Sequence, residues 1–496
     1  MQPPANSAPS NTPPGDLSLH ELQAGLARVA ALVSNYVEQG DRYPVLPRIK
    51  PGEIKARLAA SPPNDPEPLD RILDDYQQLI EPNVTHWNHP GFLAYFAITG
   101  SGPGILGETL AAALNVNAML WRTGPAATEL EETVCDWLRQ MIDLPPVFKG
   151  HINDTASIAS LLALAAARQR GCGDDLRQRG LAGRTDLPAL TVYASEHAHS
   201  SIDKAVITLG LGLENLRRIP ADEAFRLDPR RLDEAIRADR AAGKRPIGVV
   251  ATVGTTSSTS IDPVDAVADI CERERLWLHV DAAYAGSAAI CPEYRKLVEG
   301  LERADSIVLN PHKWLFTPTD CSVLLTREPD TLRRAFSVVP EYLRTTEIDA
   351  TNLMDYGVQL GRRFRALKLW FVLRAFGRRG LQERIRYHCA LARQLAGWIE
   401  CEPGFELAAP VPFSTVCFRA APAGMTPEGQ DAHNEALLER VNAAGPVLLS
   451  HTKLRGRLVL RVAIGNIRTS LVHIETAWKL VKEADRALRS APAARR

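Results

Sequence analysis

A lysine and an aspartate each stand directly after a short apolar segment of the chain. Lys313 comes just after the run 306–309, and Asp281 follows the run 276–280, about thirty residues earlier. Runs of this length and composition are typical of buried strands. Open parallel sheets bind their ligands at the carboxyl ends of their strands. We therefore expect both side chains at the ligand-binding edge of one sheet.

An amine and a carboxylate at such an edge have a specific chemical use. The amine can form a Schiff base with pyridoxal phosphate (PLP), and the carboxylate can pair with the pyridinium nitrogen of that cofactor. Taken alone, Lys313 is typical of a solvated loop charge, and Asp281 of a helix cap. His279 and His312 flank the pair. The combination favours a PLP site over the two separate interpretations.

Longer motifs surround these residues and recur along the chain. They are Thr85-His86-Trp87, Ala94-Tyr95-Phe96, Pro125-Ala126-Ala127-Thr128-Glu129-Leu130-Glu131, His279-Val280-Asp281-Ala282-Ala283-Tyr284-Ala285-Gly286, Asn310-Pro311-His312-Lys313-Trp314 and Leu360-Gly361-Arg362-Arg363-Phe364-Arg365. Together they resemble the aromatic L-amino acid decarboxylase family, the group II PLP-dependent decarboxylases. The similarity runs in order from about residue 20 to about residue 485. It implies an α/β protein of PLP-dependent transferase fold type I and a decarboxylase that converts an L-amino acid to its amine and CO2.

The segment 150–157 offers backbone amides and hydroxyls at the start of an expected helix, where the helix dipole favours an anion. An ordinary N-cap by Asp154, Thr155 or Ser157 would produce the same pattern. The resemblance places Ala156 and Ser157 on the cofactor phosphate, with Thr155 beside them. It implies further cofactor contacts by His199, which stacks on the ring, and by Thr256, Asp281, Ala283, Asn310, His312 and Lys313.

This segment also departs from the family pattern. Asn153 and Asp154 stand where the family has a Gln-Gly-like pair, and Ile158 stands where it has a glutamate. We expect these changes to alter how the cofactor is retained.

Decarboxylation leaves a carbanion-like centre that must be protonated. By resemblance the donor is Tyr342, in an irregular stretch after the lysine, because a phenol is protonated at neutral pH and can give up its proton. Relatives that oxidise aromatic amino acids to aldehydes carry phenylalanine at this position or asparagine at the stacking histidine. Tyr342 and His199 therefore favour amine formation. Catalytic roles are thus expected for Lys313, Asp281, His199 and Tyr342.

The substrate pocket is inferred from the resemblance alone. It places Trp87, Tyr95 and Phe96 in the pocket wall, with Asn117 and Met119 contributed by the partner subunit of a homodimer. Gly361 leaves room for a bulky ring. Arg461 is expected to be a structural arginine that bridges two domains. Tryptophan, tyrosine, phenylalanine and Dopa remain open as substrates, and so does a non-aromatic amino acid.

Three other classes of protein are alternatives to a decarboxylase. An aromatic aldehyde synthase would release hydrogen peroxide and ammonia. An aminotransferase would present a dedicated arginine for the substrate carboxylate, which a decarboxylase avoids gripping so that CO2 can leave. A protein that only binds PLP or a partner would lack at least one catalytic residue, and none is missing.

Composition narrows the class of protein. The 496 residues are 45% hydrophobic and 23% charged, and 58 basic residues balance 58 acidic ones, which argues against nucleic acid or an anionic membrane as a partner. The longest apolar stretches are far below the roughly 18 residues of a membrane span. The segment 1–15 has no signal-peptide pattern. Eight scattered cysteines without a Cys-x-x-Cys pair indicate neither a disulfide framework nor a metal site. A cytoplasmic protein is expected.

The pattern of apolar residues predicts four segments. These are a disordered tail (1–16), an N-terminal helical arm (17–101) with expected helices at 17–40 and 69–80, a large PLP-binding domain (102–375) and a small α+β domain (376–496). The resemblance implies that the arm forms the dimer. In the large domain, alternating strands and helices predict a mostly parallel sheet covered on both faces. The expected strands there are 190–194, 248–253, 277–280, 306–309 and 322–325, and the expected helices are 125–142, 157–170 and 263–274. In the small domain we expect helices at 381–400, 434–443 and 471–488 and strands at 416–419 and 458–462.

Overall fold

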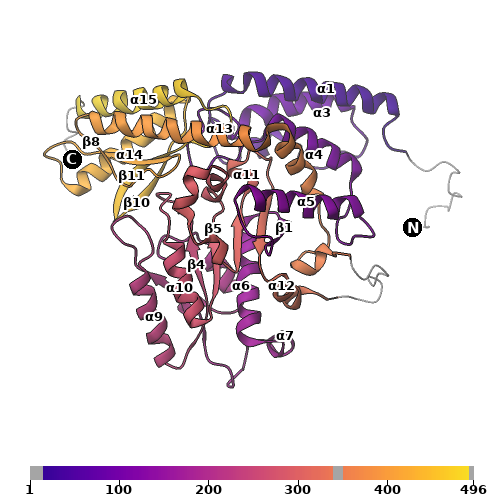
Figure 1. The fold of residues 1–496 in the computed structure, drawn as a ribbon. Coiled ribbons are helices and arrows are strands. Elements are labelled where there is room, and N and C mark those ends of the chain that lie inside the picture. Colours follow the sequence, from indigo (N-terminus) through magenta and orange to yellow (C-terminus); the bar gives the residue numbers. More distant parts are fainter. Residues whose placement is uncertain (1–14, 339–349, 491–496) are drawn as a thin grey trace, which may run out of the picture. The chain divides into compact units, whose positions relative to one another are not determined.

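The computed structural model describes residues 15–338 and 350–490. The chain divides between His89 and Pro90 into two compact units, which are drawn together in Figure 1. The first unit is helical, and the second contains two sheets. In the described residues, no helix is both long enough and apolar enough to cross a membrane.

The helices of the first unit agree with the sequence expectation. Helix α1 (Leu19–Gln39) begins with a capping box, in which the Ser18 hydroxyl accepts the Glu21 N–H and the Glu21 carboxylate accepts the Ser18 N–H. Short helix α2 (Glu53–Arg57) follows, and α3 (Leu69–Asp75) continues as a π-helical turn to Ile80. The predicted helix 69–80 is therefore α-helical only in its first part.

Within the described part of the second unit, seven strands form a large sheet in the order β1-β7-β6-β5-β4-β2-β3. The pairs β6/β5, β5/β4, β4/β2 and β2/β3 are parallel, whereas β1/β7 and β7/β6 are antiparallel. The strands are β1 (Lys149–Asn153), β2 (Leu190–Ser195), β3 (Leu216–Ile219), β4 (Arg245–Thr252), β5 (Trp277–Asp281), β6 (Ser306–Leu309) and β7 (Ser322–Thr326). A mostly parallel sheet is thus confirmed, with an antiparallel edge that the sequence did not predict.

Helices cover both faces of this sheet because its side chains alternate between the two faces. On β4, Val249 belongs to the core under α5, α9 and α10, whereas Val250 packs against α6 and α8. The helices of this region are α4 (Gly102–Leu114), α5 (Pro125–Met141), α6 (Ala156–Cys172), α7 (Asp175–Arg179), α8 (Ser201–Thr208), α9 (Pro229–Ala241), α10 (Val264–Glu274), α11 (Pro311–Trp314) and α12 (Pro329–Phe336).

A second, antiparallel sheet has the order β10-β11-β9-β8 in the described residues. Its core includes Leu395 of α13, Leu437 of α14 and Trp478 of α15. The elements are α13 (Arg365–Cys401), β8 (Phe405–Leu407), β9 (Thr415–Ala420), α14 (Pro427–Ala444), β10 (Ser450–Leu454), β11 (Arg457–Ala463) and α15 (Leu471–Ser490). Helix α13 begins well before the expected residue 381 and is kinked at Gly377. Figure 1 shows it running above the large sheet to the second sheet.

Candidate active site

Lys313 and Asp281 lie at the ends of two neighbouring parallel strands. Asp281 is the last residue of β5, and its register partner on β6 is Val308, one residue before that strand ends. Lys313 lies on α11, which begins two residues after β6. The carboxylate of Asp281 is buried and accepts the N–H of Ala283 at 3.1 Å. The two charged groups thus occupy the carboxyl edge of the sheet, as the sequence predicted.

The surroundings of Lys313 favour its neutral amine. Burial lowers the pKa of Lys313; the negative charge of Asp281 opposes this shift, and the positive charge of Arg461 adds to it. A lysine with a lowered pKa is nucleophilic near neutral pH, since a larger fraction of it carries a free electron pair. Lys313 therefore has the electrostatic character of an amine that attacks a carbonyl.

A stack of three aromatic rings adjoins this amine. Phe96 stacks on Tyr284 with ring centroids 3.9 Å apart, and Tyr284 stacks on Trp314 at 4.6 Å. The amine of Lys313 lies 5.3 Å from the centre of the Phe96 ring, and the guanidinium of Arg461 lies 4.5 Å from it. Phe96, which was predicted in the pocket wall, is therefore a neighbour of Lys313, and the stack excludes water from one side of the amine.

Arg461 links the second sheet to the edge of the site. It projects from β11 and donates from Nε to the carbonyl of Ser257 at 3.1 Å and from Nη1 to the carbonyl of Tyr95. Only 3% of the residue is exposed, and its Nη2 has no hydrogen-bond partner in the described residues. These contacts are those of the bridging arginine that the sequence predicted.

His199 has a defined hydrogen-bond arrangement. Its Nδ1 accepts the N–H of Ser201 at 3.1 Å, so the ring hydrogen of the neutral form is on Nε2. Burial lowers the pKa of His199, the charge of Asp281 opposes that shift, and Lys313 adds to it. The electrostatic coupling places His199 near both Asp281 and Lys313. Its predicted contact with the cofactor ring stays a prediction.

The start of α6 is open to an anion. Thr155 precedes the first helical residue, but its side chain accepts no hydrogen bond from the first turn of the helix. Its hydroxyl and its N–H both donate to the carboxylate of Asp154. The side-chain nitrogen of Asn153 is buried and has no partner among the described residues. Uncapped amides and an unused donor at a helix N-terminus are suited to a phosphate.

His312 can add a further donor to this region. Its Nδ1 accepts the N–H of Cys321 at 2.9 Å, and burial, with a smaller contribution from the charge of Lys313, lowers its pKa to about 3. The ring is therefore neutral at physiological pH and carries its hydrogen on Nε2. Asn310 is also buried; it receives a hydrogen bond from Ser322 and donates its N–H to the carbonyl of Ala283.

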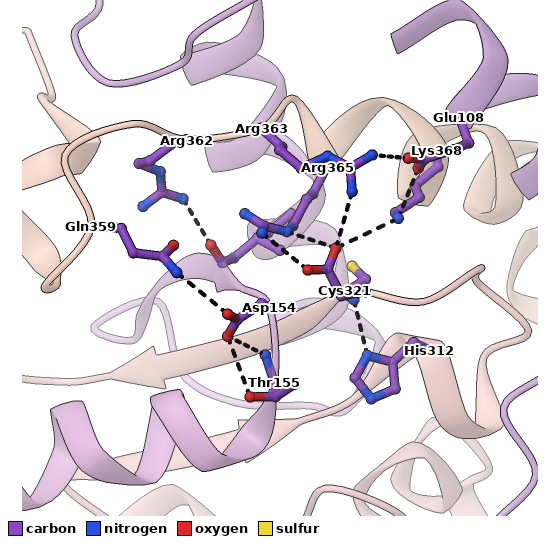
Figure 2. A network of polar contacts seen from close by, with 12 residues as sticks. Glu108, Asp154, Thr155, His312, Cys321, Gln359, Arg362, Arg363, Arg365 and Lys368 are labelled. Carbon is purple, nitrogen blue, oxygen red and sulfur yellow. Dashed lines mark hydrogen bonds and ion pairs between the residues drawn. The ribbon is translucent and has the colours of Figure 1, made fainter. Parts of the chain in front are cut away.

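A set of ion pairs, shown in Figure 2, surrounds the segment that leads into α13. Arg365 binds both oxygens of Asp320 at 3.0 and 3.1 Å, and the fully buried Lys368 lies 2.8 Å from Glu108. Arg363 also pairs with Glu108. We call Glu108, Asp320, Arg363, Arg365 and Lys368 the ion-pair network. It connects α4, the start of β7 and the start of α13.

The predicted substrate residues fall in different places. Asn117, Met119 and Gly361 lie together: Asn117 accepts the N–H of Arg362 at 2.9 Å, and its amide nitrogen is 3.5 Å from the sulfur of Met119. A Cβ added to Gly361 would lie 3.9 Å from the same nitrogen. Because the oxygen of Asn117 is already used, the amide offers chiefly a donor.

The remaining predicted residues lie in other parts of the chain. Trp87 belongs to the first compact unit. Tyr95 is exposed and contacts Arg461 through its backbone carbonyl. Thr256 is exposed, whereas Thr255 beside it is buried and hydrogen-bonds Ser258. Tyr342 lies outside the described residues.

These features define a class of protein. A lysine with a lowered pKa, a buried carboxylate and an uncapped helix start with unused donors meet at the ends of the strands of an α/β sheet. They fit the aldehyde, the pyridinium nitrogen and the phosphate of PLP in turn. The site is that of a PLP-dependent enzyme.

The comparisons with known proteins agree. Residues 51–421 match the pyridoxal-dependent decarboxylase conserved domain. The chain is 41% identical to tyrosine decarboxylase 4 of Petroselinum crispum (91% of this chain, 90% of the relative) and to a phenylacetaldehyde synthase of Arabidopsis thaliana (91% and 93%). The structure of Oryza sativa TDC with PLP and tryptamine superposes with a TM-score of 0.92 at 40% identity, over 96% of this chain and 99% of that one. The chain belongs to the pyridoxal-dependent decarboxylase family, with the type I fold and PLP as its cofactor.

Sequence reasoning missed two parts of the site. Tyr284 was recognised only as a member of a sequence motif, yet its ring is the middle one of the aromatic stack. The buried pair of Glu131 and Arg362, 2.5 Å apart, was not anticipated either. Glu131 and Arg362 each lie in one of the sequence motifs, and their charges were a usable signal. Their pairing across 231 positions was not visible in the sequence.

Proposed function

We propose that the protein decarboxylates an L-amino acid with an aromatic side chain and releases the corresponding amine and CO2. The observation that carries the proposal is that the amine of Lys313 lies beside Phe96, the ring at one end of the aromatic stack. Flat apolar surfaces of this kind suit an aromatic side chain or ring, since stacked rings gain about 0.5–1.5 kcal/mol beyond burial. Relatives named for tyrosine and tryptophan decarboxylation support the same substrate class.

In this proposal four residues carry the chemistry. When bound, PLP withdraws the electrons left behind by departing CO2. Lys313 supplies the amine that holds the cofactor, and Asp281 holds a proton at the ring nitrogen. His199 packs against the ring of the cofactor, and its Nε2–H is available as a hydrogen-bond donor. Tyr342 is proposed to return a proton to the reacting carbon.

The charges near the site support loss of the carboxylate rather than its retention. A transaminase grips the substrate carboxylate with an arginine. Arg461, the nearest candidate, is held by the carbonyls of Ser257 and Tyr95 and lies against Phe96. Its Nε and Nη1 are thus occupied, and we propose that Arg461 supports the pocket wall and does not hold the substrate carboxylate.

We further propose a cytoplasmic homodimer in which each chain completes the site of the other. Helix α1 exposes Leu19, Leu22, Leu26 and Val29, and α4 exposes Leu106, Leu110 and Leu114. Exposed apolar stripes of this kind are characteristic of surfaces that bind another protein. In such a dimer Asn117, Met119 and Gly361 would line the partner's pocket, where the amide of Asn117 would donate to an oxygen on the substrate ring.

Product analysis tests the proposal. The holoenzyme is incubated separately with each of the twenty L-amino acids and with D-tryptophan, D-tyrosine and D-phenylalanine as controls, and amine, aldehyde and peroxide are measured together. We expect amine from one or more L-aromatic substrates and none from the D-isomers. Amine from non-aromatic substrates alone would refute the substrate class. Aldehyde with equimolar peroxide would identify an aldehyde synthase instead.

A further inference from the structure

Asp154 occupies an unusual place for an acid, directly before the open start of α6. Its Oδ1 accepts the N–H of Thr155 at 2.6 Å and the hydroxyl of the same residue at 3.3 Å. Its Oδ2 accepts the side-chain N–H of Gln359 at 3.3 Å. Figure 2 shows this carboxylate between Gln359 and Thr155. Two donors that could serve an anion at the helix start are thus directed to a carboxylate of the chain itself.

Asp154 also alters the charge of the surroundings. The ion-pair network has three cations, Arg363, Arg365 and Lys368, and two acids, Glu108 and Asp320. Figure 2 shows Asp154 beside this network, and its charge added to the five charges of the network gives a sum of zero. Burial acts to lower the pKa of Arg365, and the hydrogen bond to Asp320, with a smaller contribution from the charge of Asp154, raises it.

A phosphate at the start of α6 therefore meets a region whose positive charge is already neutralised. A phosphate monoester carries about −1.5 to −2 charges at neutral pH. The groups that would favour a bound phosphate are the helix amides, the unused donor of Asn153 and Nε2 of His312. The carboxylate of Asp154 would oppose it, since like charges at short range repel each other.

We propose that Asp154 weakens the hold on the cofactor phosphate, so that PLP exchanges readily and the fraction of active enzyme follows the supply of free cofactor. The inference rests on the placement of the phosphate at the start of α6 in the proposed function. Gln359 and Thr155 hold the carboxylate in the position where it acts. The segment 359–365 is thereby connected to the start of α6 through the hydrogen bond from Gln359 to Asp154.

Binding of PLP to the full-length apoenzyme tests this role directly. Asp154→Asn keeps an oxygen to accept the Thr155 N–H and removes the charge; Asp154→Gly restores the smaller residue of the family pattern. Both variants should bind PLP about tenfold more tightly than the parent chain in equilibrium dialysis, which corresponds to about 1.4 kcal/mol. Pyridoxal, which lacks the phosphate, should bind all three proteins equally. Glu435→Gln, an exposed acid on α14, is the control for net charge.

The binding measurements distinguish a role of the Asp154 charge at the phosphate from other effects of the substitutions. Tighter PLP with unchanged pyridoxal supports the inference. Unchanged or weaker PLP in both variants overturns it, and so does an equal gain for pyridoxal, because the effect would then not involve the phosphate. An equal gain in Glu435→Gln would also overturn it. None of these measurements depends on the amino acid that is decarboxylated, so the substrate proposal stands or fails independently.

Discussion

The buried charge beside the aromatic stack is only partly compensated, whereas the buried charge in the ion-pair network is paired. At the stack, Lys313 lies beside Phe96 with its pKa lowered by burial and by Arg461, and only Asp281 opposes the shift. In the network, Lys368 is more deeply buried but contacts Glu108 and lies 4.0 Å from Asp320. The difference shows which charge is available for chemistry. A charge that reacts is left incompletely compensated, whereas a charge that fixes the structure is paired.

The largest effect should come from removing the reactive amine. Lys313→Ala should lower turnover by several orders of magnitude, because the cofactor is no longer attached to the chain. Its unfolding midpoint in urea should change little, since Lys313 forms no ion pair with any residue that the structure describes. Turnover and urea unfolding are measured on the same preparation. PLP that borohydride still fixes to another lysine, found by peptide mass analysis, would refute the assignment.

A buried ion pair outside the network, that of Glu131 and Arg362, should show the stabilising role of paired charge. Glu131 and Arg362 are 2% and 6% exposed, and Glu131 also accepts the N–H of Ile152. Glu131→Gln leaves the buried guanidinium without its counter-charge, which should cost about 3–5 kcal/mol of unfolding free energy in urea. The exposed pair of Glu293 and Arg386 is the control, and Glu293→Gln should cost less than about 1 kcal/mol. Equal losses would mean that burial does not distinguish the two pairs.

The smallest effect concerns the incompletely compensated charge beside the aromatic stack, and it is measured through pH. The positive charge of Arg461 lowers the pKa of Lys313, so Arg461→Met should raise that pKa. The neutral amine is the major form only above its pKa. Attachment of PLP to the apoenzyme should therefore need a higher pH, so its midpoint should shift upward.

Borohydride trapping followed by intact-mass measurement gives this midpoint. Arg461→Lys keeps a positive charge and should leave the midpoint near that of the parent chain. If both variants shifted equally, the packing of Arg461 against Phe96 rather than its charge would control Lys313.

The sequence predicted those parts of the site that depend on local pattern. The apolar runs of β5 and β6 and the residues after them placed Lys313 and Asp281 correctly, because strand ends in a parallel sheet share one edge. The run 322–325 was also a strand, but nothing in it revealed that β7 runs antiparallel to β6. Direction depends on the connection through α11, and that is a tertiary property.

Contacts between distant segments were beyond the sequence. The stack joins residues 96, 284 and 314, and the network joins residues 108, 320 and 363–368. Each side chain taken alone has an ordinary role as a core ring or a surface charge. The strands β1 and β3 were missed for a local reason: β1 begins with Lys149 and Gly150, and β3 contains Arg217 and Arg218. Edge strands of this kind lack the continuous apolar run of a central strand.

The kink at Gly377 divides the long helix α13 into two parts. Gly377 adopts φ 60° and ψ 175°, a conformation almost confined to glycine, and a Cβ there would meet no atom within 4 Å. The backbone angle alone, and no steric obstacle, therefore sets the bend. The part of α13 before the kink is anchored to Asp320 through Arg365, and the part after it packs into the second sheet through Leu395. One glycine therefore lets a single long helix change direction between the ion pair at its start and the second sheet at its end.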